Sequence, residues 1–149
     1  MKSKDIKEIK SITLERATKY CIEAININKS ELAPIARVSI AVTVVDITGM
    51  VLCTMAMDDV LPISPSLSVR KAITALHMKI ATIKLQQQKV NVADFGENYC
   101  CFGGGMPIEE GIEIVGAIGI SGCNTGEDDH DLAIRILNLM QYTDRNRIK

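Results

Sequence analysis

Two stretches of alternating apolar residues constrain the fold more than any other feature. Residues 38–57 read VSIAVTVVDITGMVLCTMAM, with two β-rich runs joined by the short linkage 46–49. Residues 106–122 repeat this pattern around the turn 109–111. A short linkage that ends in glycine joins neighbouring antiparallel strands. The sequence therefore predicts two β-hairpins that form one antiparallel sheet.

The return strand of the first hairpin carries a sulfur-rich face. Its members are Val51, Cys53, Met55 and Met57. Cysteine and methionine sulfur can bind soft metal ions. Methionine is also a common gap-filler in protein cores, and we interpret this face as one that a helix covers. On the long strand of the second hairpin, Gly116 and Gly119 leave room on both faces for a helix, a ligand or another backbone.

Helices accompany the strands. Thr13 is the expected N-cap of the first helix, and Thr125, with Asp128 three residues later, begins the last. The first helix has an apolar stripe of helical spacing that consists of Leu14, Ala17, Cys21, Ile22, Ile25 and Asn28. The predicted order is α-β-β-α-β-β-α, with a further short helix near residues 90–95 left open.

The middle helix, over residues 68–87, is apolar on two sides. One stripe consists of Val69, Ala72, Ile73, Leu76, Ile80 and Ile83. The second stripe, which Lys71 interrupts, consists of Leu67, Ala75, Met78 and Leu85. A helix with two apolar sides needs two burial partners. Its own sheet is one, and a second helix or another subunit must be the other, so we expect a homo-oligomer formed through residues 67–85.

A chain of 149 residues is the usual size of one domain. We predict a single α/β domain over residues 1–149, with residues 1–11 and 142–149 as frayed ends. The formal net charge of −1 and the pI of about 6.1 provide no basic surface for nucleic acid or an anionic membrane. No apolar run approaches the roughly 20 residues of a membrane span. Neither nucleic acid nor a membrane is therefore an expected partner.

The five cysteines follow no regular spacing. The chain starts with MKSKDIKEIKS, which lacks the apolar region of a secretion signal. Reduced thiols in a cytoplasm are therefore expected. The adjacent Cys100 and Cys101 also lack the C-x-x-C spacing with which one loop chelates zinc.

Residues 100–107 read CCFGGGMP, and three consecutive glycines suit either a ligand or a tight turn. A phosphate-binding loop precedes a helix and often ends in lysine. Here a strand follows and no lysine comes after the glycines, which disfavours phosphate. We predict that Gly103, Gly104 and Gly105 form the wall of a ligand pocket, because glycine admits a close ligand. A structural turn is the alternative.

Five blocks resemble, in the same order, the blocks of the GlcG/HbpS family, which includes the C-terminal domain of PduO-type corrinoid adenosyltransferases. The blocks are SITLERATKYCIEAI, VSIAVTVVDITGMVL, KAITALHMK, GGGMPI and VGAIGISG. The resemblance spans Ile12 to Gln141 and implies a profilin-like antiparallel sheet of four to five strands, flanked by helices and assembled into homo-oligomers.

The resemblance also implies a range of functions. Several members of the family bind haem, and some secreted members act as redox-sensing partners of a two-component kinase. Others lie beside diol, glycerol or glycolate metabolism. This chain starts without a secretion signal and has only two histidines, so the intracellular branch is nearer and a haem site has few strong axial candidates.

Further side chains are candidate ligand contacts. Lys71 could hold a carboxylate or propionate as a point charge, or extend along apolar surface to solvent. His77, at the border of the long helix, could ligate haem iron or cap a contact between subunits. Met106 and Cys101 flank the glycines and are soft candidate axial ligands. His130, among the carboxylates of GEDDHD, is expected at the solvated surface in its protonated, poorly ligating form.

No serine or cysteine is paired with a histidine by spacing, so no catalytic set is predicted. We expect a cytoplasmic, oligomeric protein that binds a small ligand, haem or a related tetrapyrrole, in a groove between the glycine run and the long helix. A link to cobalamin-dependent diol or glycerol metabolism is expected as well. The alternatives are a non-catalytic accessory protein of that metabolism without a cofactor, and a redox or haem-degrading enzyme.

Overall fold

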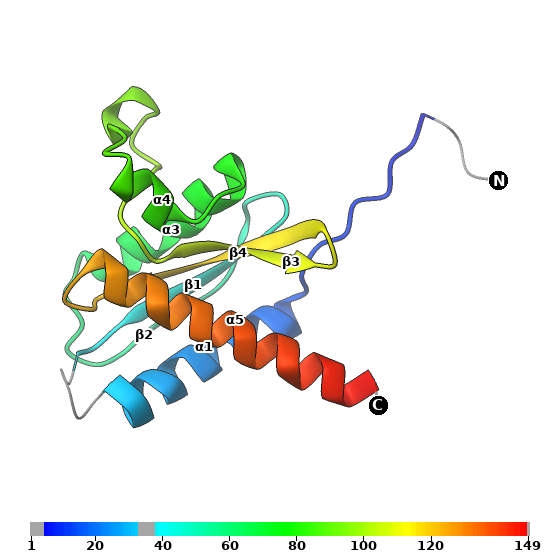
Figure 1. The fold of residues 1–149 in the computed structure, drawn as a ribbon, viewed down its shortest axis with the longest axis horizontal. Coiled ribbons are helices and arrows are strands. Elements are labelled where there is room, and N and C mark those ends of the chain that lie inside the picture. The colour runs from blue at the N-terminus through cyan, green and yellow to red at the C-terminus, as the bar shows by residue number, and fades with distance from the viewer. Residues whose placement is uncertain (1–4, 33–37, 149) are drawn as a thin grey trace.

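The protein is built around a four-stranded antiparallel sheet in the order β2-β1-β4-β3 (Figure 1). The structure is a computed structural model and describes residues 5–32 and 38–148. The strands are β1 (Ala41–Asp46), β2 (Val51–Ala56), β3 (Gly105–Glu110) and β4 (Glu113–Ser121). The two predicted hairpins are therefore confirmed, and they join through β1 and β4 in the centre of the sheet.

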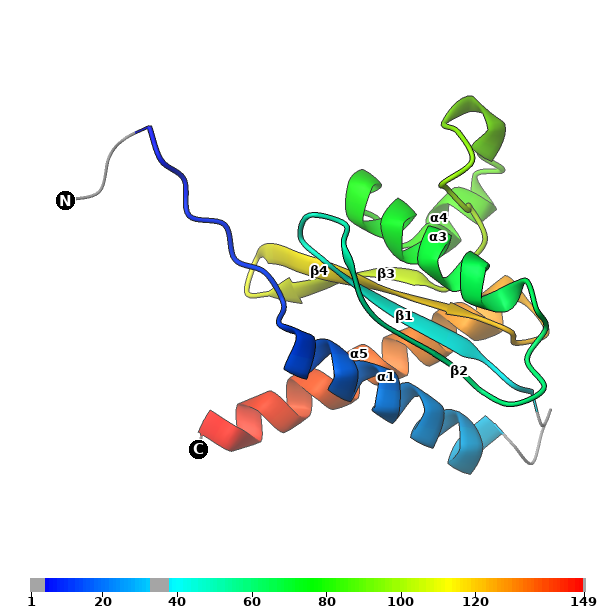
Figure 2. The same ribbon diagram turned by 180° about the vertical axis from the view of Figure 1, so that it is seen from behind.

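Helices cover both faces of the sheet, as Figures 1 and 2 show. The α-helices are α1 (Leu14–Ile27), α3 (Ser64–Met78), α4 (Thr82–Gln87) and α5 (Gly126–Ile148). A π-helical turn, η1 (Asn28–Leu32), and a 3-10 turn, η2 (Val92–Asp94), complete the set. Helices α1 and α5 lie on one face and α3 on the other, so the predicted flanked antiparallel sheet is confirmed.

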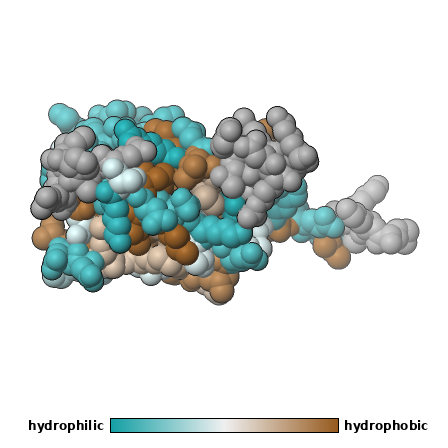
Figure 3. Space-filling view, turned by 90° about the horizontal axis from the view of Figure 1, so that it is seen from below, coloured by the Kyte–Doolittle hydropathy of each residue, from teal (hydrophilic) through white to brown (hydrophobic). Residues whose placement is uncertain are grey.

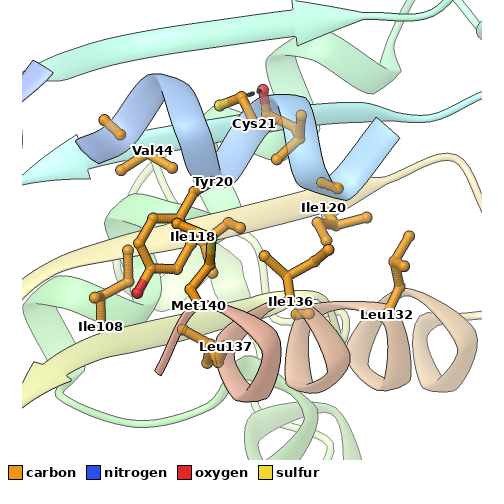
Figure 4. Close-up of a cluster of buried hydrophobic side chains, with 14 of the residues drawn as sticks. Tyr20, Cys21, Val44, Ile108, Ile118, Ile120, Leu132, Ile136, Leu137 and Met140 are labelled. Carbon is orange, nitrogen blue, oxygen red and sulfur yellow. Dashed lines mark hydrogen bonds between the residues drawn. The ribbon is translucent and has the colours of Figure 1, made fainter. Parts of the chain in front are cut away.

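The main core lies between the sheet and the α1 and α5 layer (Figure 4). Side chains from β4, α1 and α5 interdigitate there, among them Ile118, Tyr20 and Ile136. Cys53, Met55 and Met57 of the sulfur-rich face pack against this core, whereas Val51 is 43% exposed. Cys21 Sγ of α1 lies 3.8 Å from the carbonyl oxygen of Cys53. The interpretation of this face as one covered by a helix is confirmed.

Helix α1 begins as predicted and turns most of the predicted stripe inward, since Ala17, Cys21 and Asn28 are buried and Ile25 packs against the core. The Thr13 hydroxyl accepts a hydrogen bond from the Arg16 N–H at 3.2 Å, which confirms the N-cap. The buried residues are Ala17, Tyr20, Cys21 and Ala24, whereas Leu14 and Ile22 are 60% and 44% exposed. Seen from the side of α1 and α5, apolar residues on the surface are interspersed with hydrophilic ones (Figure 3).

The prediction of one long helix over residues 68–87 is wrong. Helix α3 ends at Met78, and Lys79 takes a left-handed conformation with φ of 53°, which stops the helix before α4 begins at Thr82. The buried face of α3 takes Ala72 and Leu76 from the first predicted stripe and Ala75 from the second, and adds Lys71 and small polar residues. The buried residues of α3 are Ser64, Ser68, Lys71, Ala72, Thr74, Ala75 and Leu76. The small and polar residues face the sheet because the backbone of α3 approaches it closely.

Gly119 makes this close approach possible. A Cβ atom at Gly119 would overlap the carbonyl oxygen of Ser68 and lie 2.7 Å from the backbone nitrogen of Ala72. Beside it, the Ser68 hydroxyl lies 2.8 Å from the Thr43 hydroxyl of β1. Helix α3 and the sheet are therefore in contact through backbone and short side chains.

The two chain ends differ in structure. Residues 6–13 have no regular secondary structure, although Ile12 is buried and its N–H donates to the Val115 carbonyl at 2.9 Å. Helix α5 keeps helical backbone to Ile148, past residue 142, where the sequence predicted fraying to begin. Within the described ranges, no helix has both the length and the apolar character needed to cross a membrane.

We predict that Gly119→Ala destabilises the protein by about 3 kcal/mol, because the added methyl group meets backbone atoms that cannot rotate away. Gly111→Ala is the control. Its φ is +63° but no atom lies within 4 Å of the added carbon, so only backbone strain of about 1 kcal/mol is expected. Urea unfolding measures both variants. Equal free energies of unfolding would contradict the close approach at Gly119.

Candidate functional site

The glycine run lies buried between α3, α4 and the start of α5. A Cβ atom at Gly103 would overlap the Gly126 carbonyl, one at Gly104 the Ile120 carbonyl, and one at Gly105 the Lys71 carbonyl. The absence of side chains thus allows three chain segments to meet. This supports the alternative of a structural turn, and the predicted role of the three glycines as a pocket wall stays a prediction.

Two amides of the run already have partners on α4. The Gly103 N–H donates to Gln86 Oε1 at 2.7 Å, and the Gly105 N–H donates to the Thr82 hydroxyl at 2.8 Å. The same Gln86 side chain donates to Glu127 Oε1 of α5 at 2.8 Å. These two backbone donors are engaged within the protein, in agreement with the argument against a phosphate cradle.

Lys71 lies against the glycine run, and its charge is neutralised inside the protein. Its Nζ donates to Asp129 Oδ2 at 3.0 Å and to the Ile120 carbonyl at 2.9 Å. Lys71 and Asp129 are only 3% and 4% exposed. Asp129 Oδ1 in turn accepts the Cys123 N–H at 3.0 Å. A role for Lys71 in holding a ligand carboxylate stays a prediction, and it would require this buried pair to open.

The thiols near this cluster are poor ligands in their protonated state. Burial raises the pKa of Cys101, and the neighbouring Cys100 raises it further. Burial, followed by the charge of Asp129, also raises the pKa of Cys123. Because the thiolate is the ligating form, these shifts weaken Cys101 as an axial ligand. Its proposed role in metal binding stays a prediction.

His77 lies at the exposed C-terminal end of α3. Its Nδ1 is 2.9 Å from the Tyr99 hydroxyl, and the two rings pack edge to face with centroids 5.7 Å apart. The turn between β1 and β2 is also near, since a Cβ atom at Gly49 would lie 3.6 Å from His77 Nε2. The structure thus places His77 beside Tyr99 and Gly49, and its role as an axial ligand stays a prediction.

A groove of about 450 Å³ runs between α4, β3 and α5. We call it the α4–α5 groove. It is lined by Lys79, Ile80, Ala81, Ile83, Lys84, Met106, Pro107, Glu109, His130, Ile134, Leu137, Asn138 and Gln141. Met106 is the one predicted ligand contact in this lining, and Gly103, Gly104, Gly105, Lys71 and His77 are not part of it. The volume lies within the usual range for small-molecule sites.

His130 is the functional candidate that sequence reasoning placed wrongly. It is half-buried and lines the α4–α5 groove rather than the solvated surface. Burial lowers its pKa and outweighs the nearby Asp131, which acts in the opposite direction. Its Nδ1 is buried and has no hydrogen-bond partner among the described residues. Its helical spacing from Ile134 and Leu137, which line the same groove, is the signal in the sequence that indicates this position.

A second groove, of about 840 Å³, lies between α3 and the segment that follows η2. We call it the Arg70–Tyr99 groove. It is lined by Ser66, Val69, Arg70, Val92, Gly96, Glu97, Asn98 and Tyr99. The hydrogen bond between Tyr99 and His77 connects this groove to the end of α3.

We predict that Lys71→Met destabilises the protein by roughly 3–5 kcal/mol, because it leaves the Asp129 carboxylate buried without a counter-charge. Lys71→Met with Asp129→Asn should recover part of this loss, because no buried charge remains. Lys19→Met is the control. It removes an exposed pair with Glu15 and should cost less than about 0.5 kcal/mol. A double variant no more stable than Lys71→Met in urea would contradict the ion-pair interpretation.

The lowered pKa of His130 predicts a specific pH dependence. The unfolded chain takes up a proton at a higher pH than the folded protein, so stability should fall as pH decreases from the ordinary histidine value through the folded pKa. His130→Gln should remove this fall, whereas His77→Gln should keep it. Thermal unfolding between pH 7 and pH 5 and a ¹H–¹⁵N NMR titration measure the effect. A His130 resonance that titrates above the ordinary histidine pKa would refute the assignment.

Known proteins resemble this chain over nearly its full length. A family described as "Haem degrading protein HbpS-like" matches residues 12–138. A protein of 15.0 kDa from the dhaT-dhaS intergenic region of Citrobacter freundii is 30% identical over 133 residues, which cover 85% of this chain and 89% of that protein.

Solved structures share the fold. The ORFY protein of Klebsiella pneumoniae is 25% identical with a TM-score of 0.81, and the match covers 95% of this chain and 98% of that one. The haem complex of PduOC is 27% identical with a TM-score of 0.69, and the match covers 86% and 94% of the two chains. The family match includes the whole sheet and α1, α3, α4 and the first half of α5. The resemblance noted from the residues is thus confirmed, and the chain belongs to the HbpS-like family.

Proposed function

We propose that the protein binds haem or a related tetrapyrrole in the α4–α5 groove. The family description refers to haem, and the relative PduOC was solved as a haem complex. The observation in this chain that carries the proposal is one groove that combines His130, Met106 and two lysines with apolar walls. An iron tetrapyrrole needs these three kinds of contact, namely an axial donor, partners for its carboxylates and an apolar surface for its ring.

His130 is the residue that would hold the iron of such a group. The neutral imidazole binds metal, whereas the protonated ring does not. Burial favours the neutral form of His130, because it lowers the pKa of the ring. An orphaned, buried Nδ1 is also consistent with a side chain held at this position by packing rather than by a hydrogen bond within the protein. Met106 supplies a thioether on the β3 side of the same groove.

The lysines and the apolar residues suit the rest of such a ligand. Lys79 and Lys84 are exposed, and neither forms an ion pair with a described carboxylate. Ammonium groups at the rim can therefore hold the carboxylates of a tetrapyrrole as point charges. Ile83 and Ile134 face the groove from α4 and α5 and provide apolar contact for the ring. The bound iron would supply redox chemistry, while these residues bind and orient the group.

The proposal includes a cytoplasmic homo-oligomer. Large apolar side chains before and along α3 remain outside the core and suit coverage by a second subunit. Leu61 and Ile63 are 65% and 54% exposed, and Met78 is 36% exposed. The expected link to cobalamin-dependent diol or glycerol metabolism is also part of the proposal.

A non-catalytic accessory protein of diol or glycerol metabolism, without a cofactor, is the second candidate function. The observation that favours it is the Citrobacter freundii relative, which is encoded between dhaT and dhaS. Co-purification from cells grown on glycerol or propanediol tests this candidate. A protein that elutes alone under these conditions would count against it.

A haemin titration followed at the Soret band tests the main proposal. The wild type should give a saturable shift with one haemin per groove, and His130→Ala should raise the dissociation constant at least tenfold, because the axial bond is lost. If the Met106 thioether contacts iron, Met106→Leu should shift the Soret band more than it changes the affinity for haemin. His77→Ala is the matched control and should bind as the wild type does.

Two outcomes would overturn this assignment. Loss of haemin binding in His77→Ala with normal binding in His130→Ala would indicate that haemin binds near the Arg70–Tyr99 groove. A weak, non-saturating change that is equal in all variants would show that the protein does not bind haemin specifically, and it would favour the accessory function. Circular dichroism of each variant confirms that the fold is intact.

A further inference from the structure

The Arg70–Tyr99 groove shares no lining residue with the α4–α5 groove, and the tetrapyrrole proposal does not use it. Helix α3 supplies one wall through Ser66, Val69 and Arg70, and residues 96–99 supply much of the other. Most of the polar side chains on these walls can donate hydrogen bonds, namely those of Ser66, Arg70, Asn98 and Tyr99.

Arg70 is the strongest donor in the groove. It is half-buried, and one terminal nitrogen is held by the Ser66 hydroxyl at 3.1 Å, one helical turn earlier. No described carboxylate forms an ion pair with it. A guanidinium carries five donors in a rigid fork that matches a carboxylate. Arg70 is thus positioned by the protein while most of its donors remain available.

Tyr99 is a second polar group in the groove whose position the protein fixes. Its hydroxyl lies 2.9 Å from His77 Nδ1, and the edge-to-face packing of the two rings fixes its position. In the tautomer with a proton on Nδ1, His77 donates to the Tyr99 oxygen, and the phenol proton is then free to point into the groove. The Asn98 amide lies on the same wall.

The remaining lining residues restrict the kind of anion. Val69 and Val92 offer apolar contact, and Gly96 leaves open space, since no atom lies within 4 Å of its missing Cβ. Glu97 contributes one negative charge to the groove. A second carboxylate on the ligand would be repelled by Glu97, whereas an uncharged apolar body would not.

We propose that the Arg70–Tyr99 groove is a binding site for a small organic monocarboxylate, whose carboxylate contacts Arg70 and Tyr99 and whose apolar body contacts Val69 and Val92. This site is independent of the proposed tetrapyrrole site. The carboxylates of a tetrapyrrole present the same chemistry, so the test must separate the two sources.

The test is a ¹H–¹⁵N NMR titration of the full chain with propionate and benzoate, compared with propionamide and benzamide. Saturable shifts are expected in residues 66–70 and 92–99 with the acids, and at least tenfold weaker binding with the neutral amides. Arg70→Gln should weaken acid binding at least tenfold, since a charge-assisted pair is lost. Tyr99→Phe should weaken it severalfold. Lys19→Gln removes a charge from α1, on the other face of the sheet, and should leave binding unchanged.

Three results would overturn the proposal. Amides that bind as tightly as the acids would exclude recognition of the carboxylate, and unchanged binding in Arg70→Gln would exclude this groove. Succinate that binds as tightly as propionate would exclude selection by Glu97. A haemin titration of Arg70→Gln distinguishes a small acid from the carboxylates of a tetrapyrrole as the ligand of this groove. Haemin should bind this variant as it binds the wild type. If the variant lost haemin binding and the wild type bound no small acid, the groove would instead belong to the tetrapyrrole site.

Discussion

The buried pair between Lys71 and Asp129 is the interaction on which the arrangement of the helices depends. Lys71 belongs to α3 and Asp129 to the first turn of α5, and the Lys71 ammonium also donates to the Ile120 carbonyl at the end of β4. Burial of two charges is unfavourable unless their hydrogen bonds are satisfied. Here each of the two side chains has a backbone partner in addition to the ion pair, since Asp129 accepts from Cys123. One contact thereby fixes the start of α5, and α5 supplies a wall of the α4–α5 groove.

Glycines make this burial possible. Gly104 leaves just enough room for the pair, because a Cβ there would lie 3.0 Å from Asp129 Cβ and 3.2 Å from Lys71 Cδ. Gly105 and Gly119 admit the backbone of α3 in the same way. A helix that approaches a sheet this closely can seal the pair from water. The glycine run that suggested a ligand cradle from sequence therefore has a structural explanation in the packing of α3, β4 and α5.

The parts of the fold that follow from local pattern were predictable, and those that depend on distant contacts were not. The hairpins follow from alternation and turn residues, and the N-cap at Thr13 follows from its position before an apolar stripe. The break after Met78 places a non-glycine residue, Lys79, in a left-handed conformation that nothing in its neighbourhood of the sequence requires. Lys71 looked like an interruption of an apolar stripe because its partner lies 58 positions away. Met106, a predicted ligand contact, and His130, expected at the solvated surface, both line the α4–α5 groove, and the pairing of these two segments depends on the distant contact between β3 and α5.

Ligands can bind only where polar groups are not already engaged in contacts within the protein. The Gly103 and Gly105 amides are engaged by α4, and the Lys71 charge is engaged by Asp129, so these groups are not free for a ligand in this state. The side chains that are free to contact a ligand therefore line the two grooves. One groove offers a neutral imidazole with ammonium groups at its rim, and the other offers a guanidinium and a phenol. Since α3 forms a wall of the second groove and ends at the linker that lines the first, a shift of α3 that opened the ion pair would alter both sites together.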